Sequence, residues 1–88
     1  MTKKKITTIT KTMKQDAIDT ASGFITHIRE AATRAGADRA LGSAVAIANY
    51  AQVWSLITLE DAQFLRESAR RTFAKTLARL DAEDMGAL

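Results

Sequence analysis

The chain has 88 residues, which is the length of one small domain. It contains no cysteine, which excludes disulfide bonds and thiolate metal sites, and it contains no proline and only four glycines, which favours long uninterrupted helices. The formal net charge of +3 indicates attraction to acidic partners. Because no charged-then-apolar leader is seen, the expected location is the cytoplasm.

The positive charge gathers near the amino terminus. Residues 1–14 contain five lysines and no acid, whereas residues 15–88 contain eight cations against ten acids. The sequence therefore predicts a flexible or extended basic arm over residues 1–11, a helical domain over 12–82 and a tail over 83–88. The lysines that could contact nucleic acid or an acidic partner are Lys3, Lys4, Lys5, Lys11 and Lys14.

Residues 12–35 are predicted to form the first helix. Thr12 and Gln15 fit a capping box, in which a hydroxyl and an amide satisfy the first free backbone N–H groups. Apolar side chains then recur every three or four residues along one face. Gly36 is expected to end this helix, because glycine is common just past a helix end. The apolar stripe consists of Ala17, Ala21, Phe24, Ile28, Ala31 and Ala35.

A second helix is predicted over residues 38–56, with Asp38 accepting hydrogen bonds at its start. No charged residue occurs from Ala40 to Leu59, and apolar side chains fall on both sides of the helical wheel. Such a helix is expected to be buried all round. A membrane span of this length is opposed by Asn49 and Gln52 near its middle, so burial in a bundle is favoured.

Two neighbours in a three-helix bundle would leave part of this second helix uncovered. Burying one large apolar side chain stabilises by ~1.5–3 kcal/mol, so a second chain covering several of them is favoured. Small residues such as Gly42 and Ala46 permit close helix contact. Tyr50 and Trp54, one turn apart, resemble an interface anchor pair, although ordinary core within one chain is nearly as good an interpretation. We predict a homodimer whose contact residues are Ile47, Tyr50, Val53, Trp54 and Phe64.

The third helix is predicted over residues 59–81, with a capping box from Thr58 to Asp61. Its core stripe is Leu65, Ala69, Phe73, Leu77 and Leu80, extended by Leu59 and Ala62, and Arg71, Lys75 and Arg79 fall on the back. Glu67 is placed to pair with Arg71. Such a back face is more often solvated than bound to nucleic acid. Phe64 falls among these cations, where an exposed aromatic ring suits a protein contact or base stacking.

No constellation for catalysis is recognisable. His27 is the only histidine and is expected to pair with Glu30 rather than to act as a base. The acidic residues near the carboxyl end lack the spacing of a calcium loop, and no glycine-rich phosphate loop occurs. A helix-turn-helix is opposed because the second helix has no Arg or Lys after Arg39. No enzyme, cofactor or metal is therefore expected.

These observations predict an all-α chain, a small three-helix bundle with a lysine-rich arm, assembled as a homodimer. The predicted function is that of a small non-enzymatic protein-binding module. Chains of this size and composition are common among accessory or inhibitor proteins of phages and plasmids that block a host complex. The alternative is a nucleic-acid-binding regulator that uses the lysine arm and the basic face of the third helix, Arg71, Lys75 and Arg79.

Overall fold

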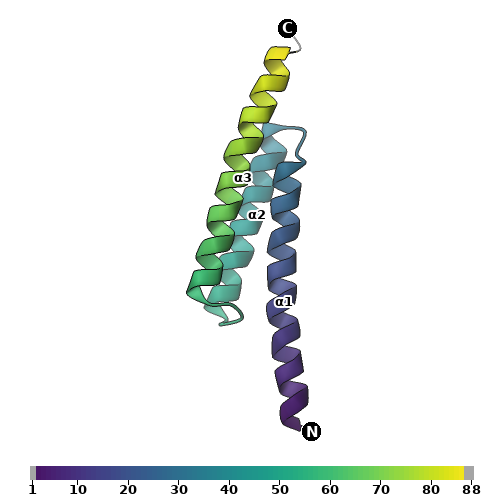
Figure 1. The fold of residues 1–88 in the computed structure, drawn as a ribbon, viewed down its shortest axis with the longest axis vertical. Coiled ribbons are helices and arrows are strands. Elements are labelled where there is room, and N and C mark those ends of the chain that lie inside the picture. The colour runs from purple at the N-terminus through teal and green to yellow at the C-terminus, as the bar shows by residue number, and fades with distance from the viewer. Residues whose placement is uncertain (1, 87–88) are drawn as a thin grey trace.

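The computed structural model describes the backbone of residues 2–86 and the side chains of residues 13–86, and it confirms the all-α class. Three helices, α1 (Thr2–Arg29), α2 (Arg34–Val53) and α3 (Leu59–Gly86), pack against one another in pairs (Figure 1). α2 runs antiparallel to α1 and α3, and no strand occurs within residues 2–86. The short connections make each helix an antiparallel neighbour of the next.

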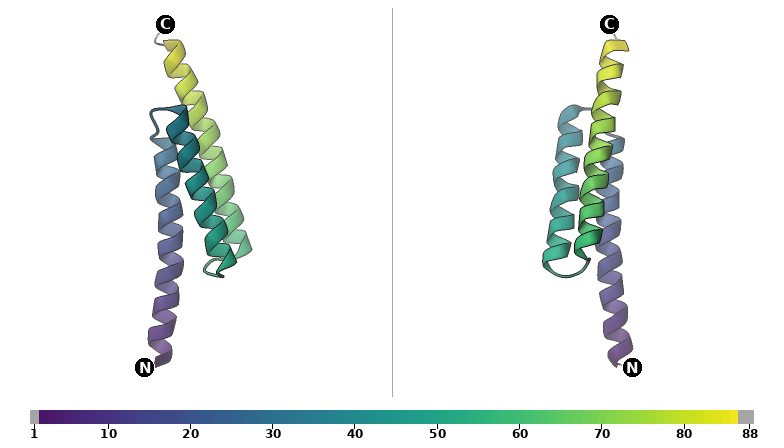
Figure 2. Two further views of the ribbon diagram at one scale, coloured as in Figure 1. Left: turned by 180° about the vertical axis from the view of Figure 1, so that it is seen from behind. Right: turned by 60° about the vertical axis from the view of Figure 1, so that its left-hand side comes forward.

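The bundle is elongated, with principal extents of 64 × 19 × 14 Å. The amino-terminal part of α1 projects beyond the α2–α3 turn, and the carboxyl-terminal part of α3 projects beyond the α1–α2 connection at the opposite end (Figures 1 and 2). Lys14 Nζ lies 3.8 Å from Asp61 Oδ2, which marks the level at which α1 leaves the bundle. The two chain ends therefore lie at opposite ends of the molecule.

α1 begins at Thr2, well before the predicted start at residue 12. The backbone of the segment predicted as a separate arm is therefore part of this helix. The side chains of Lys3, Lys4, Lys5 and Lys11 lie outside the described side chains, so their role as contacts stays a prediction.

The predicted boundary between the first two helices is wrong. α1 ends at Arg29 rather than at residue 35, and α2 begins at Arg34. Its N-cap is Thr33, not Asp38: the Thr33 hydroxyl accepts a hydrogen bond from the Gly36 amide at 3.1 Å. A Cβ at Gly36 would lie 3.2 Å from that hydroxyl oxygen, so glycine leaves room for the cap instead of ending a helix.

The carboxyl end of α2 is a Schellman motif, which stops the helix at Val53 rather than at residue 56. The Ser55 amide donates to the Gln52 carbonyl at 3.0 Å, and the Leu56 amide donates to the Ala51 carbonyl at 2.8 Å. Ser55 has a φ of 57°, a left-handed conformation that usually favours glycine. The chain thus reverses here at some conformational cost.

Replacing Ser55 with glycine is expected to raise the free energy of unfolding by about 0.5–1 kcal/mol, because glycine has no Cβ to oppose a positive φ. Urea unfolding followed by circular dichroism would measure the change. Ser55→Ala is the matched control, since it removes the hydroxyl but keeps the Cβ, and it should give no gain. Equal effects of the two substitutions would mean that the backbone conformation is not the source of the change.

The predicted start of α3 is confirmed and its predicted end is wrong. Thr58 Oγ1 accepts from the Asp61 amide at 3.0 Å, and Asp61 Oδ2 accepts from the Thr58 amide at 3.4 Å, which is a capping box. The helix then continues to Gly86 instead of stopping near residue 81. Nothing between these positions breaks a helix, and the ion pair from Arg79 to Glu83 at 2.9 Å supports the added turn.

The core is built mainly from alanine. Among the side chains of residues 13–86, seven of the eleven buried hydrophobic residues are alanines, and Ile28 is the largest fully buried side chain. Alanine allows the helix axes to approach closely, but each alanine removes little apolar surface from water. The hydrophobic stabilisation of a single chain is therefore small for its length. The buried alanines are Ala21, Ala37, Ala44, Ala48, Ala51, Ala62 and Ala69.

Candidate protein-contact surface

α2 is not buried all round, contrary to the sequence prediction. It buries only one face, through Ala37, Ala44, Ala48 and Ala51, and turns the other to solvent. Because alanines occupy the inner face, the larger apolar residues remain outside. We call this exposed side the α2 outer face; it comprises Gly42, Ala46, Ile47, Tyr50, Val53 and Trp54.

The aromatic pair forms the most prominent part of the α2 outer face. Tyr50 is 60% exposed, Trp54 is 64% exposed, and their ring centroids lie 6.1 Å apart with a tilt of 48°. Val53 beside them is 79% exposed, whereas Ile47 is half-buried. The two rings lie next to each other across one helical turn, at a separation typical of an aromatic pair.

An apolar groove joins the α2 outer face to α1. It has a volume of about 260 Å³ and is lined mostly by carbon atoms. Met13, about half exposed, lies on its α1 wall, and Ile47 and Tyr50 lie on its α2 wall. The apolar surface is therefore continuous from the outer side of α2 to the flank of α1. The remaining lining residues are Asp16, Ala17, Thr20, Ala51 and Leu56.

Small apolar residues lie inside this chain and large ones lie outside. Transfer of a large apolar side chain from water is worth ~1.5–3 kcal/mol, and isolated exposed examples are ordinary. Several that adjoin one another on an uncharged helix face are typical of an interaction surface. The exposed large hydrophobic residues within the described range 13–86 are Met13, Tyr50, Val53, Trp54, Leu59, Phe64 and Met85.

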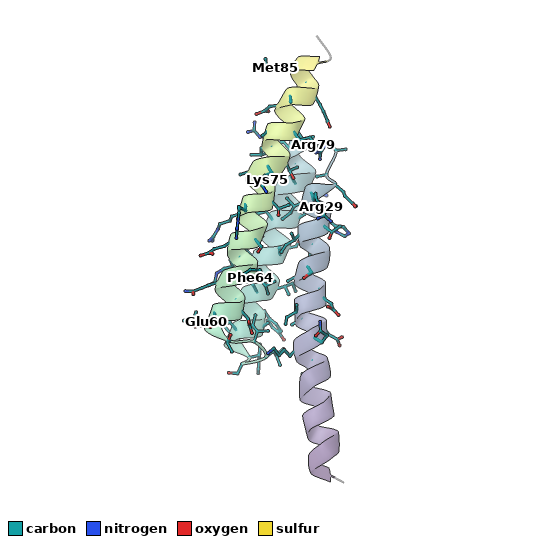
Figure 3. The ribbon with its side chains drawn as sticks, in the orientation of Figure 1. Arg29, Glu60, Phe64, Lys75, Arg79 and Met85 are labelled. Carbon is teal, nitrogen blue, oxygen red and sulfur yellow. The ribbon has the colours of Figure 1, made fainter. Side chains whose placement is uncertain are left out.

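Phe64 is separate from the other predicted contact residues. It is 65% exposed and lies on α3, which is in front of α2 in Figure 3, and it does not line the groove. The structure therefore brings together Ile47, Tyr50, Val53 and Trp54, but it does not add Phe64 to that surface.

The cationic side chains of α3 differ in the contacts that they make. The Arg79 guanidinium donates to the carbonyls of Arg29 at 3.1 Å and Ala31 at 2.6 Å, as well as to Glu83. It therefore satisfies free carbonyls at the carboxyl end of α1, where a cation is also favoured by the helix dipole. No nearby sequence pattern indicated this contact, because the residues are about fifty positions apart.

Arg29, Lys75 and Arg79 also surround a hollow of about 290 Å³ between α1 and α3, together with Thr72 and Thr76 (Figure 3). Arg71 and Lys75 are exposed. The predicted Glu67–Arg71 ion pair is not formed: between described side chains, the pairs within 4.0 Å are Lys14–Asp61 and Arg79–Glu83.

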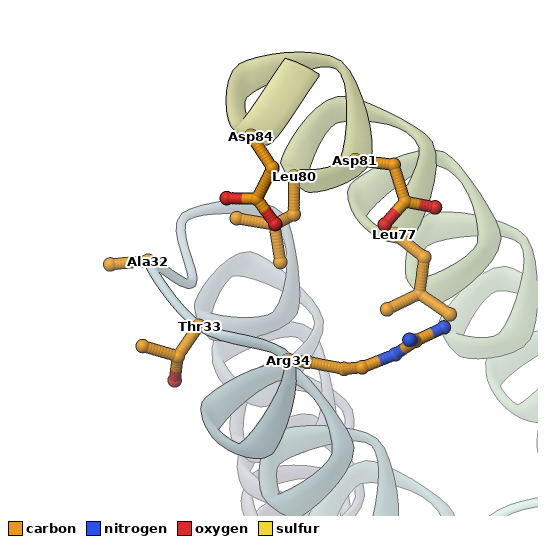
Figure 4. A pocket seen from close by; sticks show the side chains of 7 residues that line it. All are labelled: Ala32, Thr33, Arg34, Leu77, Leu80, Asp81 and Asp84. Carbon is orange, nitrogen blue, oxygen red and sulfur yellow. The ribbon is translucent and has the colours of Figure 1, made fainter. Parts of the chain in front are cut away.

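A third hollow, of about 280 Å³, lies where the α1–α2 connection meets α3 (Figure 4). Arg34, Asp81 and Asp84 give it charges of both signs, while Leu77 and Leu80 give it an apolar floor. The Thr33 hydroxyl at its edge already serves as the N-cap of α2. These side chains do not assemble a nucleophile with an adjacent base.

His27 contacts an aromatic ring instead of the predicted acid. Its ring lies edge-on to Phe24 with centroids 5.8 Å apart, and no ion pair with Glu30 is formed among the described side chains. In the described part of the chain, no three His, Asp or Glu side chains converge as metal ligands would.

Residues 2–86 contain no helix with both the length and the apolar character needed to cross a membrane. Comparison of the chain with protein-family models, curated proteins and solved structures finds no match.

Proposed function

We propose that this chain is a small non-enzymatic protein-binding module, an accessory or inhibitor protein that acts by covering a surface of another protein. The observation that supports this proposal best is the exposure of Tyr50 and Trp54 on an uncharged helix face, above a core made mostly of alanine. A chain that needed these rings for its own stability would bury them. Their place in water is explained if another protein covers them.

The α2 outer face has the physical properties of a binding surface. It lies on a regular helix, so its backbone is already ordered before binding. Aromatic residues such as tyrosine and tryptophan supply large contact areas for few rotatable bonds, and they are enriched among the residues that dominate binding energy. The adjoining groove at Met13 and Leu56 offers a recess for one side chain of the partner.

The alternative function, a nucleic-acid-binding regulator, has weaker support. Arg79 is already bound to two carbonyls and a carboxylate, which removes it from the predicted set of free cations. Glu60 and Glu67 also adjoin Phe64 on the helical wheel of α3, where base stacking would bring in phosphate charge. Lys75 shares a hollow with Arg29 and Arg79, whereas Arg71 is an exposed cation that does not line this hollow.

The test is a comparison of captured proteins. Wild-type chain and the double variant Tyr50→Lys/Trp54→Lys would be used as baits in extract of the native host, with captured proteins identified by mass spectrometry. Phe64→Lys serves as the matched control, since it changes an equally exposed ring on another helix. We expect at least one protein to be captured by wild type and by the control but not by the double variant. Identical sets from all three baits would refute the proposal.

A further inference from the structure

The α2 outer face carries no charge that would repel a second copy of itself. A charged surface repels its own copy, but α2 carries no charged residue from Ala40 to its end at Val53. Its apolar residues would gain from burial against the same residues of another chain. Other copies of the same chain are also available as partners wherever the protein is made.

Gly42 leaves room for a close neighbour at this face. Glycine is unfavourable in the interior of a helix, and a Cβ added at Gly42 would meet no atom within 4 Å. Nothing described within the chain therefore requires glycine there. Ala46, one turn later, is also exposed. Side chains this small allow a second helix to approach α2 closely.

The two ends of the molecule differ in charge. The end formed by the start of α1 has four lysines in residues 3–11 and no acid, whereas Asp81, Glu83 and Asp84 are exposed at the end of α3. These ends are opposite each other along the long axis (Figures 1 and 2). Two parallel copies would gather like charges at each end of the pair, whereas two antiparallel copies bring opposite charges to the same end.

We infer, on the basis of the proposed function, that the α2 outer face pairs with a second copy of this chain when no other protein covers it, docked antiparallel about a two-fold axis near Ala46. In this arrangement Tyr50, four residues past the axis, lies over the partner's Gly42, which has no side chain to obstruct it. The projecting start of α1 from each copy then lies at the same end of the pair as the acidic end of α3 from the other.

The absence of cysteine from the natural sequence permits a direct test of this orientation. Arg39, Ala46 and Val53 are exposed, lie seven residues apart and therefore form one line along α2, with steps of about 10.5 Å. Single variants Arg39→Cys, Ala46→Cys and Val53→Cys would be oxidised at equal concentration and analysed by non-reducing electrophoresis. A disulfide requires Cα atoms within about 4.4–6.8 Å.

We expect Ala46→Cys to form a cross-linked dimer, since the axis brings its two copies together. Val53→Cys alone should not, because its copies lie about 21 Å apart along the helices. A mixture of Arg39→Cys and Val53→Cys should form the heterodimer, while neither does so alone. Light scattering of the reduced proteins verifies that each variant still associates before oxidation.

Cross-linking of each single variant to itself would show a parallel pair and overturn the inference. A wild-type chain that remains a monomer by light scattering at high concentration would also overturn the inference. Neither result would refute the proposed function, because capture of another protein through Tyr50 and Trp54 is measured separately. Wild type and the Tyr50→Lys/Trp54→Lys variant could also capture the same proteins while the cross-linking pattern is the expected one. That result would refute binding of another protein through Tyr50 and Trp54, but it would support the pairing of two copies.

Discussion

Replacing Ile28 with alanine is expected to lower the free energy of unfolding by about 3–4 kcal/mol. Among the side chains of residues 13–86, Ile28 is the largest that is fully buried; it clusters with Ala44 and Ala69, and Phe24 and Phe73 pack against this cluster. Ala44 and Ala69 have no side-chain torsion with which to fill the cavity, so the loss should fall in the upper part of the usual range. Small domains have little stability to lose, so this one change should leave the chain close to unfolding at 37 °C.

Urea unfolding at a fixed protein concentration would measure this loss, since assembly adds to the apparent stability. Ile28→Val supplies a graded comparison, with an expected loss of about 1 kcal/mol. Leu59→Ala is the control, because Leu59 is 54% exposed and its truncation should change stability by less than about 1 kcal/mol. Equal losses for Ile28→Ala and Leu59→Ala would contradict the packing described for the core.

The number and the order of the helices could be predicted from the sequence, because apolar residues recur with helical periodicity and Thr58 and Asp61 form a recognisable capping box. The boundary between α1 and α2 could not. Thr33 and Asp38 are both acceptable N-caps, and Gly36 fits either a helix end or the third residue of a helix. Only the direction in which α2 packs decides between them, and that is a tertiary contact.

The candidate surface could also be predicted only in part, because the side of α2 that faces solvent depends on tertiary contacts. The uncharged run through α2 identified the helix that carries the exposed aromatic pair, but not the side that would face solvent. Both the alanine side and the aromatic side of this helix are apolar, so the sequence predicted burial of both. The alanine side is inside because α1, α2 and α3 approach closely, and Ala44 and Ala48 permit this where Tyr50 would not. Likewise, the contact of Arg79 with the end of α1 depends on residues far apart in the sequence.

Replacing Tyr50 with lysine is expected to weaken self-association by at least ~30-fold, or about 2 kcal/mol, the loss typical of a central interface residue. The variant keeps Trp54, which is the only tryptophan, so its fluorescence reports directly on burial of the α2 outer face. Wild-type emission should shift to shorter wavelength as concentration rises, and the Tyr50→Lys emission should not. Sedimentation velocity gives the dissociation constants.

This substitution should act on assembly and not on folding, which separates it from the Ile28 series. Tyr50 is largely exposed within its own chain, so the stability of the dilute monomer should change by no more than about 0.5 kcal/mol. Phe64→Lys is matched to it in exposure and in the charge introduced, but it lies on α3 away from the groove. Self-association that is lost equally in both variants would indicate a general effect of added charge. Association that survives in Tyr50→Lys would exclude the α2 outer face as the contact, because a lysine at its centre could not be buried without a partner for its charge.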